Sequence, residues 1–78
     1  MEIRIGVTQS PREVVVEVGD EESVRAEVKS AIDAAMKGAT DALWLTDKKG
    51  REVAIAGVKI AYVELGSPEG DRKIGFGG

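Results

Sequence analysis

The sequence predicts an α+β fold in the order ββαβββ, with a mostly antiparallel sheet of four to five strands packed against one helix. Three observations lead to this prediction. Apolar residues alternate with polar ones in both halves of the chain, the period lengthens to three and four in between, and glycine or proline marks the breaks. The length of 78 residues allows one hydrophobic core, so we expect a single domain spanning residues 1–78.

The first two predicted strands form a hairpin. In residues 2–8, Ile3, Ile5 and Val7 share one face and polar side chains occupy the other. After a short break that contains a proline, residues 13–18 alternate again, with valines at every second position. Two such segments joined by a short loop are typical of an antiparallel hairpin.

A helix is predicted next, between Asp20 and Gly38. We expect Asp20 to cap the first free amides and Gly38 to close the helix in the left-handed conformation. Between them, apolar residues recur at spacings of three and four, which places them on one stripe of a helix. These residues are Val24, Val28, Ala31, Ile32, Ala35 and Met36.

The C-terminal half predicts further strands. Residues 42–46 and 51–56 alternate and are separated by the turn sequence 47–50, which indicates a second hairpin. Gly57 interrupts the pattern before the β-rich segment 58–65. The face on which Tyr62 lies stays open, because a bulge at Gly57 would reverse it.

Composition limits the chemistry that the chain can perform. It has no cysteine and no histidine, so the commonest nucleophile, general base and metal ligands are missing. A metal site would need oxygen ligands alone, which favours magnesium or calcium. We therefore expect no catalytic residues, no metal site and no cofactor, and we predict a protein that is not an enzyme.

Charge and the N-terminal sequence limit the partners and the location. The net charge of −3 does not favour nucleic acid or an anionic membrane surface as a partner. The chain begins Met-Glu-Ile-Arg-Ile, which is neither a signal peptide nor a membrane span. We therefore expect a cytoplasmic protein.

Several segments carry a resemblance to a known family. They are the opening residues 1–7, the Thr-Asp-x-x-Gly-Arg sequence at 46–51, the Tyr-Val-Glu-x-Gly sequence at 62–66, and residues 74–77. In these segments the chain resembles a family of small actinobacterial proteins of unknown function, whose members are sometimes labelled as ATP-binding. The resemblance implies a compact intracellular domain and carries over no catalytic residue.

Nucleotide binding is not favoured by the residues themselves. A phosphate site needs a glycine-rich junction between a strand and a helix, where backbone amides meet the anion. The strand-to-helix junction here, residues 18–22, contains three carboxylates that would repel phosphate. ATP binding is therefore kept only as a less favoured alternative function.

The C-terminus predicts an alternative function. A small ββα domain followed by strands and ending in Gly77-Gly78 resembles ubiquitin-like and sulfur-carrier proteins of the β-grasp fold. Such proteins use a flexible Gly-Gly tail, and the alternative is therefore a carrier role through Gly77 and Gly78. A terminal glycine pair is also common at frayed chain ends, and residues 73–76 just before it are short enough to be an edge strand.

The favoured prediction is a protein-interaction module. If Leu43 and Leu45 face the helix, four other residues point away from it and form an apolar surface on the sheet: Val15, Ala42, Trp44 and Ala54. Such a surface with a tryptophan is typical of protein interfaces. We predict that it binds a protein partner or a second copy, giving a homodimer, and that self-association uses either this surface or an edge strand. The alternative is that Trp44 packs on neighbouring side chains of its own chain or lies under the C-terminal loop.

Overall fold

The computed structural model describes residues 1–66, and these residues form the predicted α+β fold. The order is ββαβββ, as the alternating and helical periods predict. The predicted edge strand at 73–76 lies outside the described residues. The elements are β1 (Glu2–Val7), β2 (Glu13–Glu17), α1 (Glu22–Met36), β3 (Ala42–Thr46), β4 (Glu52–Ala56), the 3-10 turn η1 (Gly57–Lys59) and β5 (Ile60–Leu65).

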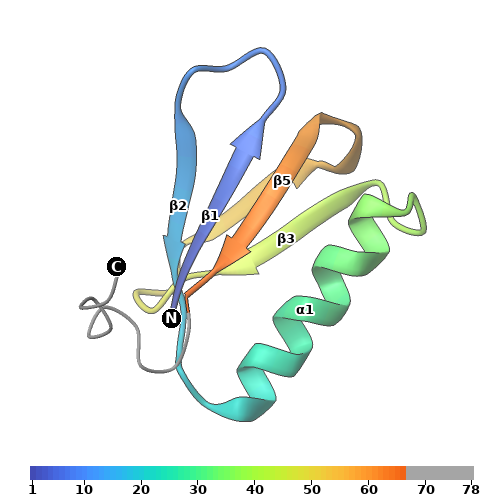
Figure 1. The fold of residues 1–78 in the computed structure, drawn as a ribbon. Coiled ribbons are helices and arrows are strands. Elements are labelled where there is room, and N and C mark those ends of the chain that lie inside the picture. Colours follow the sequence, from blue (N-terminus) through green and yellow to red (C-terminus); the bar gives the residue numbers. More distant parts are fainter. Residues whose placement is uncertain (67–78) are drawn as a thin grey trace, which may run out of the picture.

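The five strands form two antiparallel sheets rather than one continuous sheet. β1 lies between β2 and β5, and β3 pairs only with β4. In the first sheet Ile3 lies opposite Val16 on one side and Leu65 on the other. The reason is the turn η1, which redirects the chain after β4 so that β5 runs beside β1 (Figure 1).

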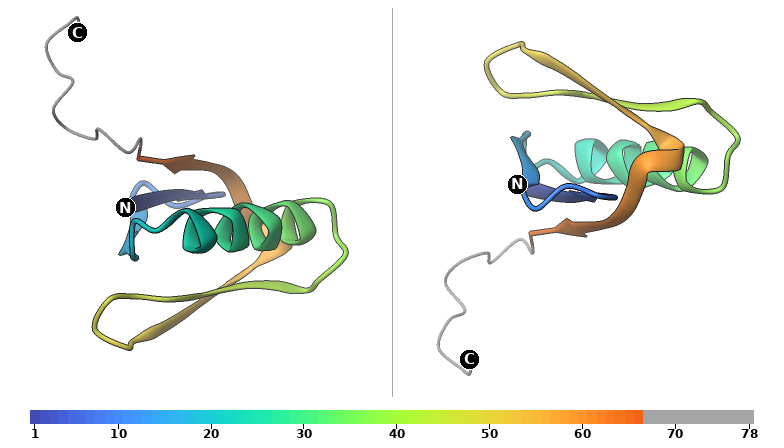
Figure 2. Two further views of the ribbon diagram at one scale, coloured as in Figure 1. Left: turned by 90° about the horizontal axis from the view of Figure 1, so that it is seen from below. Right: turned by 90° about the horizontal axis from the view of Figure 1, so that it is seen from above.

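The core lies between the two sheets and the helix. In the views of Figure 2, from below and from above, the three-stranded sheet and the β3–β4 hairpin lie on opposite sides of α1. The deepest side chains come from both sheets, and Ile3, Ile5, Val16 and Leu43 are all less than 2% exposed. The valine and isoleucine alternation of β1 and β2 therefore fixes one face of this core.

The helix begins and ends close to the predicted residues, but its cap differs from the prediction. Val28, Ile32 and Ala35 form the buried stripe. Asp20 does not cap the helix, because its carboxylate accepts a hydrogen bond from the ammonium group of Met1 at 2.5 Å. Gly38 follows the last turn with φ of +83°, as its left-handed C-cap role predicts.

Tyr62 lies on the outer face of the three-stranded sheet, which answers the question left open by the sequence. Its partner in β1 is Gly6, and the register shifts by one residue immediately afterwards, where Val7 lies opposite Ile60. The tyrosine ring covers Gly6 so closely that a Cβ atom there would lie 2.2 Å from the ring. Glycine at position 6 is therefore what allows the ring to lie flat on the sheet.

Candidate interaction surface

The β3–β4 hairpin has one buried face and one open face. On the inner face, Leu43 and Leu45 are buried. On the outer face, Trp44 lies directly opposite Ala54. Trp44 is 63% exposed, so its neighbours within residues 1–66 cover only a minor part of the side chain, and the C-terminal loop of the alternative lies outside the described residues. Ala42 and Ala56 form the next outward pair along the hairpin.

The backbone of the hairpin shows which groups point outward. The amide of Gly57 donates to the carbonyl of Asp41, and the amide of Asp47 donates to the carbonyl of Arg51. Bonded and non-bonded pairs alternate in an antiparallel ladder, so the Trp44–Ala54 pair between them is non-bonded. Its Cβ atoms are therefore close, while its amide and carbonyl groups point to the two edges of the hairpin.

The structure separates Val15 from the other three predicted interface residues. Val15 is exposed, as expected, but it lies opposite Arg4 on the outer face of the three-stranded sheet. Because the core lies between the two sheets, this face and the Trp44 face point in opposite directions (Figure 2). Ala42, Trp44 and Ala54 thus share one surface that Val15 does not join.

The outer face of the three-stranded sheet forms a polar network. The Arg4 guanidinium lies 3.5 Å from the carboxylate of Glu2 and 3.5 Å from that of Glu13. The hydroxyl of Tyr62 donates a hydrogen bond to Glu13, and this bond is the main reason that the pKa of Tyr62 is raised. Side chains on this face therefore pair with each other within the chain.

The Thr-Asp-x-x-Gly-Arg sequence forms the turn of the β3–β4 hairpin. One carboxylate oxygen of Asp47 accepts hydrogen bonds from the amides of Lys49 and Arg51, at 2.9 and 2.8 Å. Its other oxygen lies 3.0 Å from Nε of Arg51. These hydrogen bonds lower the pKa of Asp47, and the bond from the Arg51 amide has the largest effect. The contacts that the structure shows for this sequence therefore stabilise the hairpin turn.

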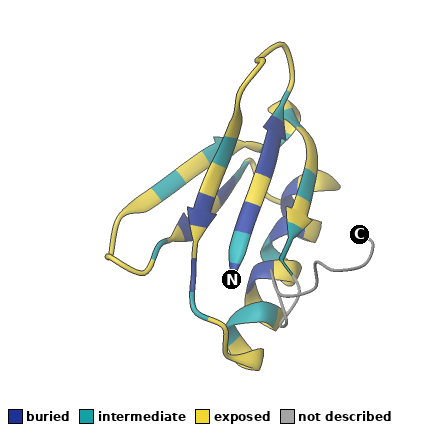
Figure 3. Cartoon of the chain, turned by 60° about the vertical axis from the view of Figure 1, so that its left-hand side comes forward, coloured by how far each residue is buried: buried dark blue, intermediate teal, exposed yellow. Residues whose placement is uncertain are grey.

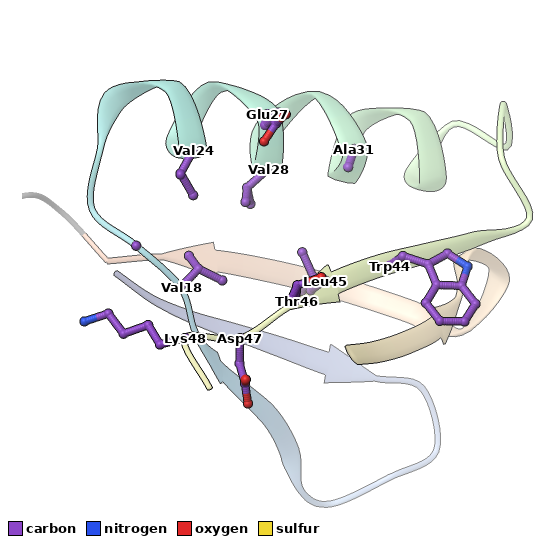
Figure 4. A pocket seen from close by; sticks show the side chains of 11 residues that line it. Val18, Val24, Glu27, Val28, Ala31, Trp44, Leu45, Thr46, Asp47 and Lys48 are labelled. Carbon is purple, nitrogen blue, oxygen red and sulfur yellow. The ribbon is translucent and has the colours of Figure 1, made fainter. Parts of the chain in front are cut away.

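An apolar groove lies between α1 and β3 (Figure 4). Its volume is about 380 Å³, with Trp44 at one end and Lys48 at the other. Val24, Val28 and Ala31 extend from the helix toward the strand. Polar side chains occur at its margin rather than converging inside it, so the groove offers apolar contact and little specific hydrogen bonding.

The strand-to-helix junction presents carboxylates where a phosphate site would need free amides. The Glu21 carboxylate lies directly over Gly19. Asp20 is held by the Met1 ammonium, whose pKa is raised mainly by that hydrogen bond. A phosphate at this junction would meet like charge, so the geometry gives no support to the ATP-binding label of the resembling family.

The part of the chain that the structure describes contains neither a candidate metal cluster nor a candidate membrane-spanning helix. Within residues 1–66, no cluster of three or more acidic side chains is arranged to hold a metal ion. In the same residues, no helix is both long and apolar enough to cross a membrane. The carrier residues Gly77 and Gly78 lie outside the described residues, so that role stays a prediction.

The sequence allows self-association through an edge strand, but it does not identify the free edge of β4 as that edge. Between the bonded pairs that link β4 to β3, the amides and carbonyls of Glu52 and Ala54 point away from β3. Among residues 1–66, no other backbone group bonds to them. The alternation of bonded and non-bonded pairs in a hairpin predicts which backbone groups of β4 point outward. It does not predict that these groups are free, because that depends on β4 having only one neighbouring strand.

Comparison with known proteins gives a family without an assigned function. A family model described as "Protein of unknown function (DUF3107)" matches residues 1–77. No curated protein matches the chain. The match agrees with the resemblance as far as a family of unknown function, while the actinobacterial distribution and the ATP-binding label stay predictions.

Proposed function

Because the chain belongs to the DUF3107 family of proteins of unknown function, we propose a role from its own geometry: a non-enzymatic interaction module that self-associates through the outer face of the β3–β4 hairpin. We define this surface as the Trp44 face, made of Ala42, Trp44, Ala54 and Ala56. The exposure of Trp44 is the single observation that carries the proposal.

Trp44 is the largest apolar side chain of the protein and is 63% exposed. Its cross-strand partner Ala54 is too small to cover an indole ring. Leu43 and Leu45, the neighbours of Trp44 in sequence, are buried, so β3 itself is well packed and the exposure belongs to one face. An apolar face of this kind, with a tryptophan at its centre, supports a protein interface.

Covering this face provides a substantial driving force. Covering an indole of this exposure removes on the order of 100–150 Å² of apolar surface from water. This contributes roughly 3 kcal/mol to the free energy of association, before the costs of association are subtracted. Two copies of the same face would both contribute. The alanines add flat apolar area, and Glu52 with Thr46 supplies a polar margin at one end of the hairpin.

The test is the solution mass, measured by light scattering over a range of concentrations. We expect the wild type to form a dimer and Trp44→Glu to be monomeric, because a charged side chain would replace the indole in the apolar contact between the two copies. Val15→Glu is the matched control, since it also places a carboxylate on an exposed apolar strand position, but on the opposite face. This control should keep the mass of the wild type.

Three other outcomes would change the conclusion. A wild type that is monomeric at all concentrations contradicts self-association. Dissociation by Val15→Glu and not by Trp44→Glu would place the interface on the three-stranded sheet. Removal of Gly77-Gly78 should leave the mass unchanged, and a loss of assembly on this deletion would also contradict the proposal.

A further inference from the structure

We propose that two copies of the chain join edge to edge through β4, in antiparallel register centred on Ala54, so that their hairpins form one four-stranded sheet. This inference rests on the proposed self-association and specifies its geometry. The occupant of the β4 edge is therefore a second copy of the chain, and the contact consists of main-chain hydrogen bonds together with the Trp44 face.

The free edge of β4 is the first observation. The amide and carbonyl groups of Glu52 and Ala54 point away from β3 and have no backbone partner within residues 1–66. β4 contains no fully buried residue, and its residues alternate between intermediate and exposed (Figure 3). An unprotected strand edge is a ready template for pairing with another chain.

The outer edges of β3 and β2 are better protected than that of β4, and β5, the remaining edge strand, carries the register shift opposite Gly6 and Val7. Helix α1 packs on β3, and both line the groove of Figure 4. The carbonyl of Glu17 at the end of β2 accepts a hydrogen bond from the Lys48 amide, and that strand carries a glutamate at each end. β4 has a glutamate at one end only and contains no lysine, proline or bulge. The devices that usually block edge pairing are thus fewest on β4.

The sequence of β4 is self-complementary in one register. With Ala54 opposite Ala54 of the second copy, these two residues exchange both hydrogen bonds, because their groups already point outward. Glu52 then lies opposite Ala56 of the second copy, so no two carboxylates face each other. Like charges directly opposite would oppose pairing, and this register avoids them.

The same register places the two Trp44 faces side by side on one surface of the four-stranded sheet. Across the four strands one row of side chains reads Trp44, Ala54, Ala54 of the second copy and Trp44 of the second copy. At about 4.8 Å per strand, the two tryptophans are roughly 14 Å apart at their Cα atoms. The two alanines between them leave space in which both indole rings can fold over the seam. A bulky residue at position 54 would fill that space.

Single-cysteine cross-linking tests the register, because the chain has no cysteine of its own. In Ala54→Cys the two cysteines would be about 5.5 Å apart at Cα, within the roughly 4.4–6.8 Å that a disulfide requires. In the control Ala56→Cys they would be roughly 14 Å apart, because each lies opposite residue 52 of the other copy. We expect mild oxidation to convert most of the Ala54→Cys chain into a covalent dimer and little of the control.

The outcomes separate this inference from the proposed function. If light scattering shows a dimer of the wild type and of Ala54→Cys but no selective cross-link forms at position 54, edge pairing is wrong and face-to-face association through Trp44 remains. If the wild type is monomeric throughout, both proposals fail. Equal cross-linking of both variants would indicate random collision and would also overturn the register.

A proline pair provides a second measurement. Ala54→Pro removes an amide that has no backbone partner within residues 1–66, and proline is tolerated on edge strands. Val15→Pro does the same on β2, where the amide of Val15 also points outward because the Val18 amide bonds to Met1. With folding confirmed by circular dichroism, only Ala54→Pro should produce monomers. A dimer that persists in folded Ala54→Pro would contradict edge pairing.

Discussion

The two outer faces of this small domain differ in how their side chains are satisfied. On the three-stranded sheet, Arg4 pairs with two glutamates, and Tyr62 covers Gly6 while bonding to Glu13. On the β3–β4 hairpin, Trp44 stands beside alanines and is mostly exposed. Both faces cover the same core, but within residues 1–66 the charged and aromatic side chains of the first face find partners, whereas Trp44 on the second stays mostly exposed.

This difference distinguishes a solvated face from a candidate interface. Both faces follow strands whose other side is buried, so their inner packing does not explain the contrast. A surface whose charges are paired and whose aromatic ring lies flat gains little from a partner. A surface with an uncovered indole gains by covering it, and this is why we place the function on the hairpin.

The largest expected difference comes from adding a valine to each face. Gly6→Val forces the Tyr62 ring off the sheet, since a Cβ atom would already lie 2.2 Å from it. We expect a loss of about 1–3 kcal/mol in the free energy of unfolding. Ala54→Val on the open face should stay within about 0.5 kcal/mol, because the residue is exposed.

Urea unfolding in dilute solution, where the chain is monomeric, measures both changes. The double variant Gly6→Val with Tyr62→Ala should recover part of the loss, since the two positions are in direct contact. If valine changed the free energy of unfolding equally at positions 6 and 54, the two faces would not differ in packing. The reason for placing the interface on the hairpin would then be lost.

How far the sequence predicts this contrast depends on the range of the interaction. A period of two correctly places Leu43 and Leu45 inside and Trp44 outside, because alternation is a local property. The face of Tyr62 was not predictable, because a one-residue register shift between β1 and β5 decides it. That shift leaves no mark on the pattern of apolar residues in β5.

Long-range contacts explain the remaining differences. Val15 and Trp44 look equivalent in sequence, but they belong to different sheets because η1 directs β5 to β1. Asp20 looks like a helix cap, and its carboxylate bonds instead to an ammonium group nineteen residues away. Neither partner is visible from the local sequence on which capping and hairpin rules rest.

A smaller effect is expected from the charges. Arg4 lies on a face with several carboxylates, and two of them are within 3.5 Å. Arg4→Met should cost about 0.5–1 kcal/mol at low salt, because the glutamates then repel each other without a cation between them.

Salt screens exposed charges, so the cost of Arg4→Met should shrink at high ionic strength. Arg51→Met on the hairpin is the control, since it removes a single pair, between the exposed Arg51 guanidinium and the mostly covered Asp47 carboxylate, and leaves no such cluster. The free energy of unfolding at two salt concentrations measures both. A salt-independent cost of Arg4→Met would show that its aliphatic stem, not its charge, stabilises this face.

The smallest expected effects are those of pH on stability. The hairpin turn should lose stability at low pH, and the three-stranded sheet should lose it at high pH. The pKa of Asp47 is lowered below its usual 3.8 by hydrogen bonds in the hairpin turn. Its contribution is therefore present above about pH 4 and is lost as the pH falls through the lowered pKa. The pKa of Tyr62 is raised above 10.0, mainly by its bond to Glu13. Its contribution is present below pH 10 and is lost as the pH rises through the raised pKa.

Thermal melting across pH, with Asp47→Asn and Tyr62→Phe beside the wild type, separates these two contributions. Asp47→Asn should weaken the acid-side loss only, and Tyr62→Phe the loss at high pH only. The Met1 ammonium has a pKa raised above 8.0 and adds its own alkaline loss, which Tyr62→Phe keeps. If Tyr62→Phe left the profile above pH 10 unchanged, the tyrosine hydroxyl would not be bound to Glu13 in solution. The side chains on the outer face of the three-stranded sheet would then satisfy each other less fully, and the difference between this face and the Trp44 face would be smaller.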